Sequence, residues 1–278
     1  MKKLVLLLGL MSLVPMSIAG QSTEKIKGDR NVTSRQTYVD DFEKLVVGND
    51  FSIEIVYNSK PSVEIETDDN LHDIIQFEVV DGTLIFSQTM RITSKKKMHI
   101  VVNYGDALKE IKVKDDGEIR SLTSMELSET SLETYDNARA YLNINATSFN
   151  YKSYGKSKTR LNLSAGSVKI ELNDNTKLDA LINSKSADFD LYQRSDAVIE
   201  GNAETSTIRL DNSTNFTGEK FDVKKVDALV EGNSDLIISA METISLGVSG
   251  DSEVYLYGSP LITITKFEDS AKLQKKIR

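Results

Sequence analysis

Aspartates at the turns between short apolar segments are the residues of this chain best suited to catalysis. They are Asp115, Asp116, Asp136, Asp174, Asp196 and Asp251. Stacked at neighbouring turns about 5 Å apart, such carboxylates would shift one another's pKa or gather Ca²⁺. A polysaccharide lyase or hydrolase would need a facing pair of them. Asp is also a common turn residue, because its side chain bonds to nearby backbone, and these positions skip some turns. The enzyme alternative therefore depends on whether the carboxylates converge in one groove.

The rest of the sequence offers no catalytic or metal-binding set. The chain has no cysteine, and its two histidines, His72 and His99, lie far apart in sequence. His99 alternates with apolar neighbours, which predicts a surface position. No zinc motif, no Ser/His/Asp hydrolase motif and no glycine-rich phosphate loop can be drawn from these residues. We therefore predict no catalytic residue, no bound metal and no cofactor.

Three tyrosines are candidates for surface contacts. Tyr141, Tyr255 and Tyr257 alternate with apolar residues, so they are expected to face outward on strands. Exposed aromatic rings suit contact with carbohydrate or protein. Tyrosine is also favoured on exposed strands for pairing reasons, so plain strand packing is the alternative interpretation.

A repeat of about 19 residues must position these side chains. In residues 244–256, apolar residues alternate at 244, 246 and 248, a Gly-Asp-Ser corner follows, and alternation resumes at 254 and 256. The same pattern begins at residues 168 and 226. Nine corners are predicted, and their last residues are Gly117, Ala138, Ser157, Thr176, Asp196, Thr214, Ser234, Ser252 and Ser270. Gly, Asn, Asp and Ser suit such corners because they tolerate positive φ or satisfy their own backbone.

The period predicts an all-β chain whose body is a parallel, right-handed β-helix-like solenoid of about nine rungs. A meander of hairpins has no reason to keep one period through nine copies, whereas a coil that climbs one strand spacing per turn does. Nine rungs would form a rod on the order of 40 Å long. Each rung buries too few side chains to be stable alone, so the rungs must stack and the ends need caps.

The chain divides into four predicted parts. Residues 1–20 form a signal peptide, 21–35 a polar flexible lead, 36–105 a non-repeating β head that caps the coil, and 106–278 the solenoid. Head and solenoid are expected to form one continuous domain. Lysines near the C-terminus discourage end-to-end strand pairing, although self-association stays open.

Composition limits the compartment and the partners. Two lysines, an apolar run and a small-x-small site at residues 17–19 predict export to the periplasm, the cell surface or the medium. Without cysteine the chain cannot be a lipoprotein, and no other stretch is long and apolar enough to span a membrane. The formal net charge of -8 disfavours nucleic acid as a partner.

The order and spacing of several segments are similar to a known family. They are residues 42–55, 63–71, 80–85 and 108–113. The succession resembles the putative auto-transporter adhesin head GIN domain family of exported Bacteroidetes proteins, over roughly residues 38–265. The resemblance implies a β-solenoid body and supplies no catalytic residues. Family members tend to carry Gly-Ser-Gly corners, whereas the first corners here are acidic or basic.

The leading hypothesis is an exported, non-enzymatic β-solenoid that works through its surface, as an adhesin-like or cell-envelope protein binding glycans or proteins. The first alternative is a β-helix polysaccharide-active enzyme or carbohydrate-binding module that uses the corner carboxylates. The second is a purely structural assembly module.

Overall fold

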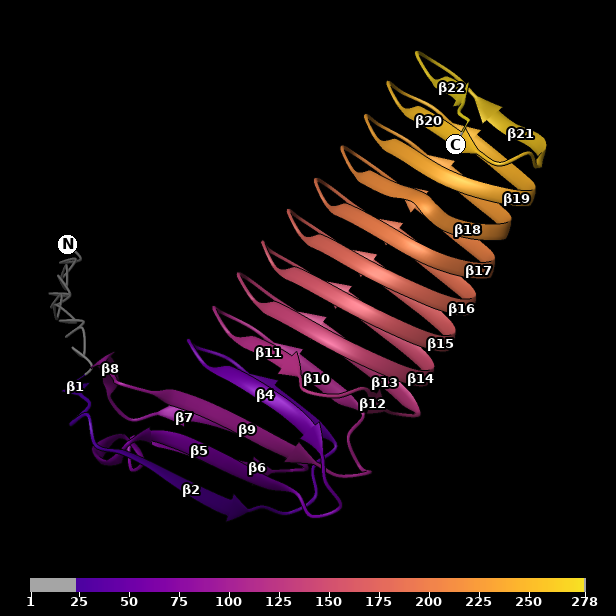
Figure 1. The fold of residues 1–278 in the computed structure, drawn as a ribbon. Helices are drawn as coiled ribbons and strands as arrows, with labels where there is room; N and C mark the ends of the chain where they lie inside the picture. Colours follow the sequence, from indigo (N-terminus) through magenta and orange to yellow (C-terminus); the bar gives the residue numbers. More distant parts are fainter. Residues whose placement is uncertain (1–23, 278) are drawn as a thin grey trace, which may run out of the picture.

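The computed structural model describes residues 24–277, and most of them lie in strands stacked along a rod (Figure 1). The predicted signal peptide at residues 1–20 lies outside the described residues. The body is a β-solenoid, as the repeat predicts, because each turn of the chain pairs in parallel with the next. Leu142 pairs with Leu161, which in turn pairs with Ala180.

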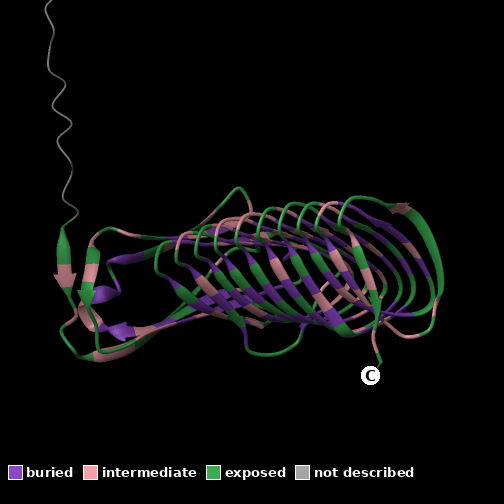
Figure 2. Cartoon of the chain, turned by 90° about the horizontal axis from the view of Figure 1, so that it is seen from above, coloured by how far each residue is buried: buried purple, intermediate pink, exposed green. Residues whose placement is uncertain are grey.

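Six long strands form the regular part of the coil. They are β14 (Arg139–Ser153), β15 (Lys158–Leu172), β16 (Lys177–Leu191), β17 (Asp196–Leu210), β18 (Asn215–Val230) and β19 (Asp235–Val248). Each bends midway: residues 139–146 of β14 pair with 158–165, and residues 148–153 pair with 167–172. We call the surface formed by the first halves face 1 and that formed by the second halves face 2. Buried and exposed residues alternate along both, so the core lies between the faces (Figure 2).

Shorter strands continue the coil toward the N-terminus. They are β10 (Glu110–Val113), β11 (Glu118–Ser121), β12 (Met125–Glu126) and β13 (Glu129–Thr134). Two earlier strands, β3 (Lys44–Val47) and β4 (Ser52–Tyr57), pair in parallel with β10 and β11. The coil therefore begins at Lys44, inside the segment 36–105 that the sequence assigns to the head.

The remaining head strands close the N-terminal end. β7 (Thr83–Gln88) and β9 (Met98–Tyr104) add to β3 and β4 in parallel. β5 (Ser62–Asp68) and β6 (Ile75–Val80) then pair antiparallel with β9 and β7, which ends the parallel stack. The short 3₁₀ helix η1 (Asp69–Leu71) follows β5, and Leu71 and Ile74 are buried there. This is the non-repeating cap that the sequence predicts.

The predicted flexible lead at residues 21–35 differs from the structure in its described part. β1 (Lys25–Lys27) pairs in parallel with β8 (Arg91–Ser94), and β2 (Val32–Tyr38) pairs antiparallel with the whole of β5. Most β2 side chains are exposed. Backbone hydrogen bonding rather than apolar burial therefore holds this edge strand, and a hydropathy pattern could not reveal it.

The corners are tight turns with a left-handed residue in each, as the repeat predicts. Positive φ angles occur at Asp115 (59°), Asp136 (58°), Gly155 (79°), Asp174 (61°), Gln193 (65°), Asn212 (73°), Gly232 (81°), Gly250 (75°) and Asp269 (62°). Two predicted positions are wrong by one residue: the corners end at Ser195 rather than Asp196, and at Ala271 rather than Ser270. Most of the residues that end the corners are buried small ones; Ser157, Thr176 and Ser195 are each 0% exposed.

The C-terminal end of the coil has no strand above it among the described residues. β20 (Glu253–Tyr257) and β22 (Lys272–Lys275) extend face 1, and β21 (Leu261–Phe267) extends face 2. Ile262 is 40% exposed, whereas its partner Ile244 in the rung beneath is 1% exposed. The last rung therefore leaves apolar side chains open because nothing described covers them. No helix within residues 24–277 is long and apolar enough to cross a membrane.

Candidate functional site

The three predicted surface tyrosines all point outward on face 1, but they do not form one site. Tyr141 on β14 and Tyr255 on β20 occupy the same outward position in strands that are six rungs apart. At a strand spacing of about 4.8 Å, this separation is roughly 29 Å. Tyr257 lies beside Tyr255, two residues along β20.

Local contacts distinguish these tyrosines. The Arg120 guanidinium lies over the Tyr141 ring, 4.4 Å from its centroid. The Tyr255 ring has Lys276 Nζ at 4.6 Å, and its hydroxyl donates to Glu253. Tyr255 is thus engaged by its own strand and by the chain end, whereas Tyr141 borders open surface.

Tyr141 lies in a shallow groove of about 650 Å³ on face 1. Two outward rows of side chains cross the rungs there, one containing Tyr141, Arg160 and Asp179, the other running beside it. The groove is lined by Arg120, Ser121, Tyr141, Leu142, Asn143, Arg160, Leu161, Asn162, Asp179, Ala180, Leu181, Val198 and Glu200. Leu181 and Val198 are apolar residues at solvent-facing positions, and each is 43% exposed. The groove combines an aromatic ring, guanidinium groups, amides, carboxylates and exposed apolar atoms.

A second group of tyrosines was not predicted. Tyr135, Tyr154 and Tyr192 each occupy the first position of a corner. The rings of Tyr135 and Tyr154 stack with centroids 5.1 Å apart and planes inclined by 15°. The sequence signal for these tyrosines is their spacing, because each stands three residues before the last residue of its corner.

The stacked pair is anchored by charged neighbours. Tyr135 donates its hydroxyl hydrogen to Glu133 at 3.1 Å, and Lys112 Nζ donates to the same carboxylate at 3.1 Å. Lys112 Nζ also lies 4.5 Å from the Tyr135 ring centroid. Burial and the carboxylate of Glu133 raise the pKa of Tyr135 to about 12. These contacts hold the corner edge in place.

The corner aspartates are occupied by backbone hydrogen bonds between rungs. Asp174 Oδ2 accepts from the Gly155 N–H at 2.7 Å, and Asp115 Oδ2 accepts from the Asn49 N–H at 2.9 Å. Asp136 Oδ2 lies 3.4 Å from the nitrogen of Asp115. Each carboxylate therefore satisfies a backbone donor in the preceding corner.

Two of the other aspartates, Asp116 and Asp196, accept hydrogen bonds from asparagine side chains of the neighbouring rung. Asp116 accepts from Asn137 at 3.1 Å, and Asp196 lies on strand β17, where it accepts from Asn215 at 2.7 Å. None of the corner carboxylates borders either the Tyr141 groove or the neighbouring hollows on the coil. Across residues 24–277, no three His, Asp or Glu side chains are placed to share a metal ion.

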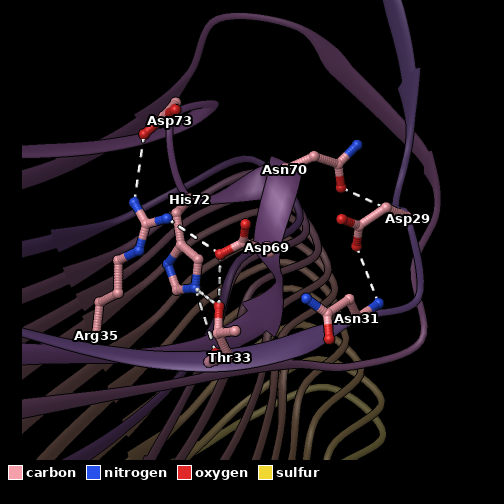
Figure 3. Close-up of polar contacts among 8 residues, drawn as sticks. All are labelled: Asp29, Asn31, Thr33, Arg35, Asp69, Asn70, His72 and Asp73. Carbon is pink, nitrogen blue, oxygen red and sulfur yellow. Dashed lines mark hydrogen bonds and ion pairs between the residues drawn. The ribbon is translucent and has the colours of Figure 1, made fainter.

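A polar cluster in the head resembles a catalytic set in composition (Figure 3). His72 Nε2 lies 3.0 Å from Thr33 Oγ1 and 3.2 Å from the Thr33 carbonyl oxygen. Since a carbonyl oxygen only accepts, Nε2 carries the hydrogen and donates it. The Thr33 hydroxyl then donates to Asp69 Oδ1 at 3.0 Å. His72 therefore does not act as a base toward Thr33.

Arg35 completes this cluster and ties β2 to η1. Its guanidinium contacts Asp69 at 3.1 Å and Asp73 at 3.4 Å, as drawn in Figure 3. The hydrogen bonds from Thr33 and Arg35 hold the pKa of Asp69 below its usual value. The other histidine, His99, lies 2.8 Å from Glu54 on the neighbouring strand and is partly exposed. Both histidines join strands of the head.

Comparison with protein families gives a match over most of the chain. Residues 41–181 and 161–260 match the family described as "putative auto-transporter adhesin, head GIN domain". The chain belongs to this family. The match covers the coil from its first rung to β20, as well as most of the head.

Solved structures share the fold of this GIN domain. For a putative adhesin from Parabacteroides distasonis, the superposition includes 91% of this chain and 100% of the adhesin, with 17% identity and a TM-score of 0.67. For a putative adhesin from Parabacteroides merdae, the superposition includes 91% of this chain and 98% of the adhesin, with 16% identity and a TM-score of 0.63. A putative lipid binding protein from Parabacteroides distasonis covers the same shares, with 16% identity and a TM-score of 0.56. Comparison with curated proteins gives no match.

The GIN domain fold presents outward side chains on face 1, on face 2 and at the corners. The corner carboxylates, which only the enzyme alternative would use, bond to backbone N–H groups of neighbouring corners, and the head cluster joins β2 to η1. The description of the family supports an adhesin-like protein. The Tyr141 groove gathers aromatic, apolar and charged side chains at one place on face 1.

Proposed function

We propose that the chain is an exported, non-enzymatic, adhesin-like protein of the cell envelope that binds glycans through the Tyr141 groove on face 1. The observation that carries this proposal is that the Tyr141 ring lies in one groove with exposed Leu181 and Val198 and with polar side chains from five neighbouring strands. Aromatic and apolar atoms pack against the C–H faces of a sugar ring. Amides, guanidinium groups and carboxylates bind its hydroxyl groups.

The geometry of a solenoid favours a long ligand. Outward residues repeat at every rung, so the row of Tyr141, Arg160 and Asp179 presents a hydrogen-bonding side chain at intervals of about 4.8 Å. Arg160 and Asp179 are 3.6 Å apart and mostly exposed, so a ligand can exchange that ion pair for its own hydrogen bonds at little cost. A linear glycan lying along the rod would contact several rungs.

The binding test uses residues 21–278 on a panel of envelope and host glycans. We expect Tyr141→Ala to weaken binding of the best glycan about tenfold, since a central aromatic contact typically accounts for more than 1 kcal/mol. Tyr257→Ala, an outward tyrosine on the same face but outside the groove, is the matched control and should leave the affinity unchanged. Equal effects of the two variants would refute the groove.

The same purified protein separates the other two functions. Release of sugar products that disappears with Asp115→Asn or Asp174→Asn would favour the polysaccharide-active enzyme. Protein that ignores every glycan and assembles end to end would favour the structural module; the open apolar side of β21 is the observation that keeps this candidate in view.

Export is tested by the mature N-terminus. We expect mass spectrometry of protein recovered from the envelope or the medium to show a chain that starts near residue 20 or 21. Full-length chain that remains in the cytoplasm would refute export.

A further inference from the structure

A second pocket lies where face 1 meets the head, and it shares no lining residue with the Tyr141 groove. In the long strands the chain bends directly from face 1 to face 2, but at the end of β9 and beyond β12 it crosses in irregular loops. These loops enclose about 460 Å³. The lining is Tyr57, Tyr104, Gly105, Asp106, Leu108, Lys109, Glu126, Leu127, Ser128 and Glu129.

Tyr104 brings an unsatisfied group to this pocket. Its side chain is 1% exposed, and its hydroxyl has no hydrogen-bond partner among the described residues. Burial, with smaller contributions from Glu126 and Tyr57, raises the pKa of Tyr104 to about 12, so the hydroxyl is neutral at pH 7. Buried polar atoms in folded proteins almost always have a partner. The Tyr104 hydroxyl is therefore a polar group in the pocket wall whose hydrogen-bonding capacity the fold leaves unused.

Tyr57 provides an aromatic surface in the same pocket. Because β4 and β9 pair in parallel, Tyr57 lies directly beside Tyr104. Their rings meet edge to face, with centroids 5.7 Å apart and planes at 73°. The carboxylate of Asp106 raises the pKa of Tyr57, which places the two side chains close together, and 48% of Tyr57 is exposed. The ring is thus held in place yet accessible to a ligand.

The charges of the pocket are predominantly negative. Asp106, Glu126 and Glu129 contribute three carboxylates, and Lys109 is the single cationic lining residue. The ammonium of Lys109 lies 3.1 Å from the carboxylate of Glu43, which does not line the pocket. Lys109 is therefore paired with Glu43 and does not balance the three carboxylates of the pocket. An anionic ligand would be repelled here, whereas a cation gains attraction from the carboxylates and from the face of an aromatic ring.

We propose that this pocket binds an organic ammonium group, presented by a small amine such as an amino sugar or a polyamine. The ammonium lies against the Tyr57 ring, with the carboxylates around it and the Tyr104 hydroxyl oxygen as an acceptor for one N–H. Leu108 and Leu127 contact the carbon skeleton of the amine. This site goes beyond the proposed glycan groove and does not depend on it, because the two are lined by different residues.

The test is calorimetric titration of residues 21–278 at pH 7 with glucosamine, N-acetylglucosamine and spermidine. The acetylated sugar has the same ring without the positive charge, so it is the matched neutral probe. We expect glucosamine or spermidine to bind at least tenfold more tightly than N-acetylglucosamine, and the affinity to fall as NaCl is raised. Preference between the two amines tells an amino sugar from a polyamine. If neither glucosamine nor spermidine binds more tightly than N-acetylglucosamine, or if none of the three probes binds, the proposal is overturned.

Variants locate the site. Glu126→Gln removes a charge at constant shape, and Tyr57→Leu removes the aromatic face; each should weaken amine binding at least fivefold. Glu204→Gln changes an exposed glutamate at a bend higher in the coil and should leave the affinity unchanged. Unaltered far-ultraviolet circular dichroism establishes that each variant is folded. Amine binding that survives both Glu126→Gln and Tyr57→Leu would place the ligand elsewhere and refute this pocket.

Discussion

Asp174 Oδ2 accepts a hydrogen bond from the Gly155 N–H of the preceding corner at 2.7 Å, and both residues have positive φ angles. Hydrogen bonds to charged groups contribute about 1.5–3 kcal/mol when their partners are shielded from water. Because this corner is partly exposed, we expect Asp174→Ala to lower the free energy of unfolding by about 1–2 kcal/mol. Asp174→Asn keeps an acceptor oxygen and tolerance of positive φ, so it should cost less than half as much. Urea unfolding followed by circular dichroism measures both, and equal losses would contradict the hydrogen-bond explanation.

The corner residues illustrate what the sequence could predict. The period and the need for positive φ are local properties, so they are visible in Gly, Asn and Asp at regular spacing. The hydrogen bond between Asp174 and Gly155 is not local, because it depends on how one rung lies over another. The same acidic residues were therefore open to a catalytic interpretation until their partners were known.

The head and the second pocket were less predictable for the same reason. Tyr57 and Tyr104 become neighbours only because β4 and β9 pair in parallel across the head. That pairing joins segments far apart in the chain and breaks the repeat, so no period signals it. The Tyr141 groove is intermediate: the outward position of Tyr141 follows from strand alternation, whereas its closeness to Val198 requires the exact register of the rungs.

Substitutions at two glycines with positive φ can distinguish the cost of backbone strain from the cost of steric contact between rungs. A Cβ on Gly250 would lie 2.2 Å from the Gly232 carbonyl oxygen, whereas one on Gly82 would have no atom within 4 Å. Their φ angles are nearly equal, 75° and 70°. We expect Gly82→Ala to cost about 1–2 kcal/mol from strain alone, and Gly250→Ala to cost about 1–3 kcal/mol more because the rungs must shift. Thermal unfolding compares them, and equal losses would show that rung contact at the corner is unimportant.

Tyr151 is the centre of a buried cluster of hydroxyl groups at the corner that ends at Ser157. Its hydroxyl lies 3.0 Å from Thr134 Oγ1, which also bonds to Ser153 and Ser157 at 3.0 Å. Tyr151→Phe leaves these buried groups with one partner fewer, so we expect a loss of about 1–3 kcal/mol. Tyr141→Phe, which removes a hydroxyl from the outer surface, should stay within about 0.5 kcal/mol of the wild type. A Tyr151→Phe protein as stable as Tyr141→Phe would argue against the cluster.

Asp68 makes the stability of the head dependent on pH. Its carboxylate is 0% exposed and accepts backbone N–H bonds from Arg30, Lys96 and Lys97. Burial alone would raise the pKa of Asp68, but these donors outweigh it and hold the pKa below the usual value of 3.8. A carboxyl whose pKa is lower in the folded state stabilises the fold above its unfolded pKa, and this contribution is lost as the pH falls through the folded value.

We therefore compare the urea midpoints of the wild type and Asp68→Asn, which lacks the titrating group. The wild-type midpoint should be higher by the largest margin at pH 6–7. This margin should shrink steadily below about pH 4. Asp73→Asn is the matched control: Asp73 follows η1, its side chain is 88% exposed, and it contacts Arg35 at 3.4 Å. An exposed ion pair of this kind adds little stability, so the midpoint of that variant should follow the wild type across the pH range. A margin between wild type and Asp68→Asn that stays constant from pH 7 to pH 3 would mean that the ionised carboxylate is not what holds residues 30, 96 and 97 together.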